Sequence, residues 1–202
     1  TAYQPWSTNN QAAAYTPGIN DAADLTGDYA NADWGVYNAI SNGGNAAGQR
    51  RTLTGDEWDY LLFKRNASMI EEVENVLFVK AVVAGSKGII LFPDGFTLPG
   101  NVSVPCNMNN TYSDYVGNNY SAEDWTNFEA VGCVFLPAAG IRMYYSVAPR
   151  IRVPSAGTAG GYWSSTHRDS SFSNALSFGS SSVYVSSGNR SNGLSVRLVQ
   201  DL

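Results

Sequence analysis

The chain has 202 residues, 44% of them hydrophobic and 12% aromatic, so it can bury the core of one domain and is too short to favour two. Only 14% of the residues are charged and the net charge is −5 at pH 7, which argues against nucleic acid and anionic membranes as partners. We therefore expect a single domain over residues 1–202.

Residues 1–30 read as an irregular leader, because prolines and glycines interrupt a mostly polar stretch. The apolar run at Ile89–Phe92 is far shorter than a bilayer span, so we expect no direct membrane span. Residue 1 is Thr and not an initiator Met, which leads us to expect a processed or excised ectodomain.

Two helices are predicted in the first third of the chain. Residues 31–44 have apolar side chains at helical spacing between Asn31, which can cap the start, and a Gly pair at the end. In residues 53–66, Thr54 and Glu57 have the spacing of a capping box, and Leu53 and Trp58 that of a hydrophobic staple. Asn66 can close this second helix.

The chain changes character from residue 76 onward. Apolar and β-branched runs at 75–85, 87–96 and 130–147 are separated by Pro, Gly and a Pro-Asp-Gly turn, which indicates strands. Helices followed by strands predict an α+β fold. Residues 98–124 show no periodicity and are predicted to form a long loop on the sheet.

The last forty or so residues are rich in Ser, Gly and Asn around isolated aromatics. Leu176, Phe178, Val183 and Val185 alternate with polar positions, so their face should be buried and Ser177 and Tyr184 should be exposed. The opposite face and the loops have the composition of an antibody-like binding surface. The candidate ligand-binding residues are His167, Arg168, Asp169, Ser171, Phe172, Asn174, Ser177, Gly179, Ser181, Ser182, Tyr184, Ser186, Asn189, Ser191, Asn192 and Leu194.

Groups that could support catalysis or metal binding are sparse. His167 is the only histidine and lies in a polar loop, with no nucleophile elbow nearby. No His/Cys cluster has zinc spacing, and the acidic residues near 56–59 and 71–74 are expected to cap a helix and face solvent. We therefore predict no catalytic residue, no metal and no cofactor. Cys106 and Cys133 are consistent with one disulfide and equally with unpaired thiols.

Four segments carry a resemblance to a known family. The helix at 51–62 (RTLTGDEWDYLL) resembles one in the branch of the C-type lectin superfamily that holds formylglycine-generating enzymes and tropism determinants. GIILFPDGF, VFLPAAGIR and the closing GYWSST…SVRLV resemble, in the same order, Bacteroidetes paralogous surface domains and the variable proteins of diversity-generating retroelements. The resemblance covers roughly residues 34–201 and implies two helices packed on a mostly antiparallel sheet. It also implies that residues 160–202 display a ligand-binding surface.

The chain departs from the enzymes and sugar-binding lectins of that superfamily. Formylglycine-generating enzymes carry reactive or copper-binding cysteines late in the chain, whereas no cysteine follows Cys133 here. The calcium- and sugar-binding signatures of true lectins are missing as well. Retroelement mutagenesis of Asn codons cannot produce Lys, Glu, Gln, Trp or Met, and residues 167–194 contain none of these, although the whole chain is poor in Lys and Glu.

The sequence thus predicts a binding module without catalysis, displayed on a bacterial cell surface or a phage virion, by a lipid anchor or as a phage protein. Its ligand is expected to be a protein or another macromolecule, with Phe172, Tyr184 and Tyr162 as aromatic anchors. The alternative is a structural or adhesive surface lipoprotein domain of the same fold that was never diversified.

Overall fold

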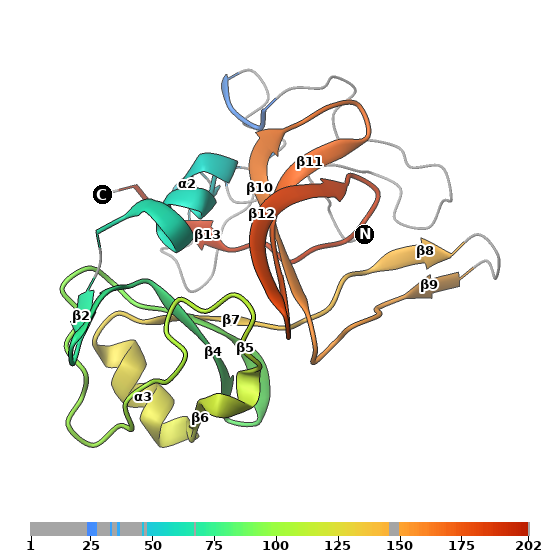
Figure 1. Ribbon diagram of the computed structural model, residues 1–202. Coiled ribbons are helices and arrows are strands. Elements are labelled where there is room, and N and C mark those ends of the chain that lie inside the picture. The colour runs from blue at the N-terminus through green and yellow to red at the C-terminus, as the bar shows by residue number, and fades with distance from the viewer. Residues whose placement is uncertain are drawn as a thin grey trace.

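A computed structural model gives an α+β fold, as predicted (Figure 1). The structure describes residues 24–27, 33, 36, 46, 48–66, 68–145 and 150–201. The predicted leader 1–30 and the predicted helix 31–44 lie almost entirely outside these residues.

Helix α2 (Gly55–Asp59) begins where the sequence predicts it. Thr54 Oγ1 accepts a hydrogen bond from the Glu57 amide, and the Glu57 side chain accepts one from the Thr54 amide, so the capping box is complete. Residues Tyr60–Lys64 continue as a π-helical turn, η2, in which the Arg65 amide donates to the carbonyl of Tyr60. Arg65 then turns into extended backbone, so Asn66 does not close the helix as predicted.

The central sheet has the order β6-β4-β5-β7, and each of the three predicted apolar runs contributes one strand to it. Strands β4 (Phe78–Val83), β5 (Ser86–Leu91) and β7 (Val134–Pro137) are antiparallel, whereas β6 (Asn119–Tyr120) runs parallel to β4. Both faces of this sheet are buried. One face, with Phe78 and Ile89, contributes to the first core cluster, and the other, with Val79 and Ile90, contributes to the second.

The segment predicted as a long loop, residues 98–124, is only partly a loop. It contains the 3-10 turn η3 (Tyr115–Gly117) and strand β6, and helix α3 (Ala122–Ala130) begins near its end. Ser121 and Asp124 form a second capping box, and Phe128 is buried in the second core cluster. Figure 1 shows α3 against the central sheet, on the side away from α2.

Smaller pairings complete the molecule. Strands β2 (Ser68–Ile70) and β3 (Val73–Val76) form one hairpin, and β8 (Met143–Tyr145) and β9 (Arg150–Arg152) form another that projects from the body in Figure 1. The predicted turn at Phe92–Gly95 is present, and Gly95 supplies its positive φ of 68°. Strand β1 (Arg51–Thr52) pairs antiparallel with β13 (Leu198–Val199), which brings segments from opposite ends of the described chain together.

The C-terminal sheet has the order β10-β11-β12 and is antiparallel throughout. Its strands are β10 (Gly160–His167), β11 (Phe172–Gly179) and β12 (Ser182–Asn189). Leu176 and Phe178 from this sheet share the first core cluster with Trp58 of α2 and Phe78 of β4. The C-terminal sheet is therefore packed on the same core that supports the central sheet.

Candidate ligand-binding surface

The pairing register of β11 and β12 divides the candidate residues between two faces. Leu176 lies opposite Val185, and Phe178 lies opposite Val183, on the face turned toward the first core cluster. Leu176, Phe178 and Val183 are buried, and Val185 is half-buried against the same cluster. Tyr184 on the other face is 49% exposed. The predicted alternation is confirmed at Leu176, Phe178, Val183 and Tyr184, whereas Val185 and Ser177 are intermediate in exposure.

Five candidate residues share the outer face of this sheet, and we call them the outer stripe. Ser177 lies opposite Tyr184, and Gly179 lies opposite Ser182, while Ser186 pairs with the buried Ala175. Tyr184 and Ser186 are exposed and the other three are half-exposed. The outer stripe comprises Ser177, Gly179, Ser182, Tyr184 and Ser186, and it offers one large ring surrounded by small hydrogen-bonding groups.

A second group gathers at one end of the sheet, where Phe172 pairs with Asn189, and we call it the loop end. It comprises His167, Arg168, Asp169, Ser171, Phe172, Asn189, Ser191 and Asn192. The Asp169 carboxylate accepts hydrogen bonds from the amides of Ser171 and Phe172 at 2.8 and 2.9 Å. Asn189 Oδ1 accepts from the amide and hydroxyl of Ser191. These side chains fix their own turns, so the loop end is ordered before any ligand arrives.

The outer stripe and the loop end lie at different places on the C-terminal sheet and do not surround one pocket, and Phe172 of the loop end is in register with the inner-face residues Leu176 and Phe178. Strand β11 has eight residues, so Phe172 and Gly179 are about 23 Å apart along the strand. Ser181 lies at the hairpin tip beyond Gly179, at the far end from the loop end. None of the candidate residues lines any of the four best-formed cavities among the described residues.

Two further candidate residues, Asn174 and Leu194, lie against the scaffold. Asn174 is half-buried on the inner face next to α2, where a Cβ added to Gly55 would lie 2.9 Å from its Nδ2. Leu194 packs on Trp163 and Ala175 in the third core cluster and lies over Gly161 and Gly188. Both therefore contact the scaffold as well as bordering the surface.

The prediction that Tyr162 is an aromatic anchor is wrong. Tyr162 is 4% exposed, stacks on Phe178 and donates its hydroxyl proton to the carbonyl of Pro137. Burial raises the pKa of Tyr162 to about 12. The alternation could not assign this residue, because Tyr162 and Trp163 are both buried, on opposite faces of β10.

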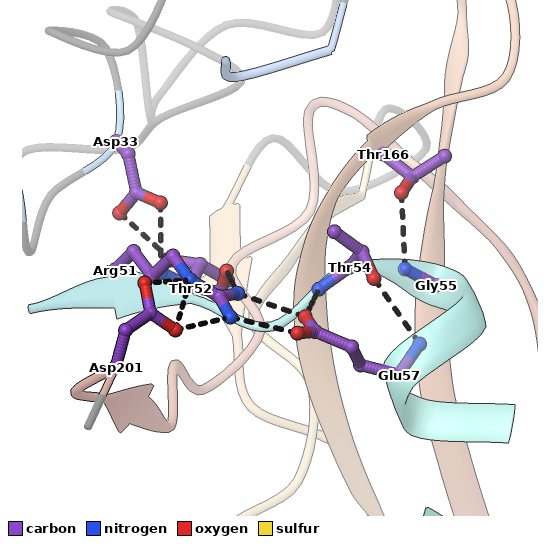
Figure 2. Close-up of polar contacts among 8 residues, drawn as sticks. All are labelled: Asp33, Arg51, Thr52, Thr54, Gly55, Glu57, Thr166 and Asp201. Atoms are coloured by element: carbon purple, nitrogen blue, oxygen red, sulfur yellow. Dashed lines mark hydrogen bonds and ion pairs between the residues drawn. The ribbon is translucent and has the colours of Figure 1, made fainter. Parts of the chain in front are cut away.

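A polar network connects the C-terminal end of β10 to the start of α2 (Figure 2). Thr166 of β10 accepts a hydrogen bond at 3.0 Å from the amide of Gly55, an unpaired donor of the first helical turn. The carboxylate of the buried Asp33 accepts from the amide and hydroxyl of Thr52 at 2.7 and 2.8 Å. Thr166 directly precedes His167, so this network positions the start of the loop end.

Arg51 lies at the centre of the ion pairs in Figure 2. Its guanidinium donates to both carboxylate oxygens of Glu57, at 2.8 and 2.7 Å, and to Asp201 at 2.7 Å. The hydrogen bond from Arg51 lowers the pKa of Glu57 to about 2, and the backbone amide of Thr54 contributes in the same direction. The network thus holds α2, β1 and the chain after β13 in one arrangement.

Asp24 and Leu25, near the start of the described chain, contact the C-terminal end of β10. The Asp24 carboxylate lies 2.9 Å from both the backbone amide nitrogen and the ring Nδ1 of His167. The Leu25 amide donates to the carbonyl of Ser165, and the Leu25 side chain packs in the third core cluster. The segment at residues 24–27 is therefore part of the support for the loop end.

The opposite end of the β11–β12 hairpin is held by Lys80, a residue that the sequence analysis did not single out. Lys80 is fully buried in β4, and its ammonium donates to the carbonyls of Thr111, Ser113 and Ser180 at 2.6, 3.0 and 3.2 Å. Burial lowers the pKa of Lys80 to about 8. The sequence signal for this role is the single Lys inside the apolar run LFVKAVV, because a cation buried in such a strand needs several hydrogen-bond acceptors.

Arg190 is a second buried cation that donates to a backbone carbonyl, here at the loop end. It is 1% exposed, its amide donates to the carbonyl of Ser171, and its guanidinium donates to the carbonyl of Ser170. Arg168 donates to the Ser187 hydroxyl at 2.7 Å on the neighbouring strand. These bonds link the β10–β11 connection to β12 and to the residue that follows it.

The two cysteines are not bridged. Cys133 is buried in the second core cluster, and burial raises the pKa of its thiol to about 12, so this thiol is protonated at neutral pH. Cys106 is exposed, and its Sγ lies 3.1 Å from the carbonyl oxygen of Gly117. Within the described residues, no cluster of three His, Cys, Asp or Glu side chains could hold a metal ion.

Comparisons with known proteins give one match. A family described as a domain of unknown function (DUF8237) matches residues 112–199, which include η3, α3 and the whole C-terminal sheet. No curated protein and no solved structure is significantly similar to the chain. No helix among the described residues is long and apolar enough to cross a membrane.

Proposed function

We propose that this protein is a ligand-binding module with a C-type lectin fold, in which the outer stripe and the loop end recognise a macromolecule without catalysis. The fold assignment is supported by the α+β architecture, the mostly antiparallel pairing and the helix α2 beside the C-terminal sheet. It is further supported by the resemblance of the segments at 51–62 and 160–199 to variable proteins of that fold.

The observation that carries the binding role is the exposure of two aromatic rings on a rigid sheet. Tyr184 is 49% exposed on the outer face, and Phe172 is 38% exposed at the loop end, where the register places it on the same face as Leu176 and Phe178. Ser, Asn and Gly surround both rings. Large rings with few rotatable bonds provide contact area at low entropic cost, and small polar neighbours adapt their hydrogen bonds to a partner.

The shape of the surface favours a macromolecular ligand. A small molecule is usually enclosed by a concave pocket, and the four best-formed cavities of the described residues contain none of the candidate residues. The candidate residues extend over about 23 Å along β11, which matches the extent of a protein–protein contact, and such a contact buries about 800 Å² on each partner. The ligand is accordingly a protein or another macromolecule.

Display on a bacterial cell surface or on a phage virion would bring this face to its ligand, and no cofactor or metal is needed for the contact. The scaffold suits diversification, because Lys80, Arg190 and α2 hold the ends of the hairpin through backbone carbonyls and packing. Side chains on the outer stripe can then vary without changing these supports.

A structural or adhesive surface domain of the same fold is the second candidate. It is favoured by the contacts that His167 and Arg168 make inside the protein, with Asp24 and Ser187. Under this alternative, the loop end is a closed structural element and was never diversified. The neighbouring DNA distinguishes the two: a reverse transcriptase gene and a near-repeat of codons 167–194 with Asn codons at the differing positions would support diversification.

A capture experiment tests the binding role directly. Wild type, the double variant Phe172→Ala/Tyr184→Ala and the control Tyr112→Ala/Val116→Ala are immobilised and exposed to extracts of bacterial or host-cell surfaces. The control removes side chains that are 81% and 64% exposed in the segment before β6. We expect the wild type and the control to retain the same partner and the double variant to lose it. Identical capture by all three proteins would contradict the proposed site.

A further inference from the structure

A separate apolar groove is lined by residues of α2 and η2, the end of β5, β7 and β13. Its cavity volume is about 160 Å³. The buried Trp58 and Leu91 lie at its floor, and the half-buried Leu61, Val134 and Val199 form its walls. The groove shares no residue with the outer stripe or the loop end.

The side chains that line the groove lack packing neighbours on the side that faces it. Core side chains normally pack at the density of organic crystals, and a void beside them loses dispersion energy. Gly132 helps to keep the mouth open: its φ of 90° disfavours any residue with a side chain, and an added Cβ would lie 3.4 Å from Pro93. A dry apolar cavity of about 150 Å³ accepts a molecule such as benzene, so this groove accommodates one ring or one branched alkyl group.

Two arginines border the groove, and they differ in what they contact. Arg65 is 7% exposed, and its guanidinium already donates to Asp94 at 2.9 Å and to the carbonyls of Leu77 and Phe92. Arg197 is exposed, and no carboxylate of the described residues lies within ion-pair distance of it. The groove therefore combines an apolar floor with one cation at its edge that is available to an anion.

We propose that this groove binds a small carboxylate that carries one aromatic ring or one branched alkyl group. The apolar group lies against Trp58 and Leu91, and the carboxylate faces the guanidinium of Arg197. An Arg guanidinium matches the two oxygens of a carboxylate, and the apolar wall beside it strengthens the attraction by excluding water. A neutral ligand of the same shape gains only the apolar part of this contact.

The test uses 3-phenylpropionate and its neutral isostere 3-phenylpropionamide, titrated by calorimetry and by ligand-observed NMR. We expect the wild type to bind the acid roughly five-fold more tightly than the amide, as for a partly exposed ion pair. In Arg197→Gln the acid and the amide should bind equally, because only the charge term is removed. Arg197→Lys should retain most of the preference for the acid. Arg197 is exposed, so these variants leave the core intact.

A groove-filling variant tests the location. Val134→Phe places a ring in the wall of the groove and should weaken both probes about ten-fold, whereas Val153→Phe, at a site that is 52% exposed directly after β9 and does not line the groove, should change neither. Equal binding of acid and amide by the wild type would overturn the proposal, as would unchanged binding in Val134→Phe. If a tripeptide ending in Phe bound more than ten-fold tighter than the free acid, a peptide C-terminus would replace the small carboxylate as the occupant.

Discussion

The central sheet and the C-terminal sheet bury their strands in different ways. In β5, the adjacent residues Ile89 and Ile90 are both fully buried, because one faces the cluster with α2 and the other faces the cluster with α3. In β12, Val183 is 5% exposed and the adjacent Tyr184 is 49% exposed. A strand covered on both faces has a continuous apolar sequence, whereas a strand with one free face alternates.

The difference distinguishes a sheet that is enclosed by core from a sheet that keeps part of one face exposed. The central sheet lies between two core clusters, so most side chains of β4 and the apolar side chains of β5 are enclosed by neighbours. The C-terminal sheet rests on the first of these clusters through Leu176 and Phe178 and exposes the outer stripe. Substitutions should accordingly be costly on both faces in the apolar parts of β4 and β5, whereas in β12 their cost should depend on the face.

The largest expected effects come from core residues of the two sheets. Trp163→Ala should lower the free energy of unfolding by about 3–5 kcal/mol and Ile90→Ala by about 2–5 kcal/mol, because each leaves a cavity. Trp163 is 2% exposed and Ile90 is fully buried. Chemical denaturation measures both, with Tyr184→Ala as the exposed control. A Trp163 variant as stable as the control would mean that β10 is not part of the core.

The next largest loss of stability is expected for Lys80→Met, which tests the link between the two sheets. The change keeps an apolar stem in β4 but leaves the carbonyls of Thr111, Ser113 and Ser180 without their shared donor. We expect a loss of about 1–3 kcal/mol in the free energy of unfolding. Hydrogen exchange at the amides of Ser181 and Ser182 should also become faster, whereas exchange in α3 should not. Unchanged protection at the hairpin tip would contradict the role of Lys80 as its anchor.

The parts of the fold that sequence could predict are those fixed by short-range patterns. The capping box at Thr54 and Glu57 predicts the start of α2, and the alternation from Leu176 to Val185 predicts the register of the β11–β12 hairpin. In both cases the physical cause lies within a few neighbouring residues. The same holds for the Pro-Asp-Gly turn after β5.

The features that the sequence did not predict have physical reasons as well. Helix α3 begins with a capping box at Ser121 and Asp124, but the Asn- and Tyr-rich stretch before it obscured that signal. The burial of Tyr162 depends on packing against Phe178 and on Pro137, far away in the sequence. The supports of the candidate surface, Lys80 and Asp24, bond to segments that are distant along the chain. Local pattern cannot reveal such partners.

Acid should weaken the network that joins α2 to β1. The Glu57 carboxylate has its pKa lowered to about 2 beside Arg51, so its stabilising contribution is present above pH 4.5 and is lost as the pH falls from 4.5 toward 2. The Glu57 side chain is 36% exposed, and solvent screening reduces the contribution to about 1 kcal/mol. Glu57→Gln should be less stable than the wild type by that amount at pH 7, and the two should converge near pH 2. Denaturation across this range is the measurement, with Glu72→Gln, an exposed carboxylate in the β2–β3 turn, as the control.

The smallest effect is expected on the outer stripe itself. Replacing Ser177, Ser182, Tyr184 and Ser186 together by Asn, Asp, Ser and Tyr, respectively, should change the free energy of unfolding by less than about 0.5 kcal/mol per site, because these side chains are exposed or half-exposed. Asp169→Ala is the matched comparison: it removes the acceptor for two backbone amides and should cost about 1 kcal/mol. A stripe variant that unfolds at the same denaturant concentration as the wild type, but no longer captures its partner, would separate display from support. A stripe variant destabilised as much as Trp163→Ala would instead show that the exposed face has a structural role, and the binding surface would have to be sought elsewhere.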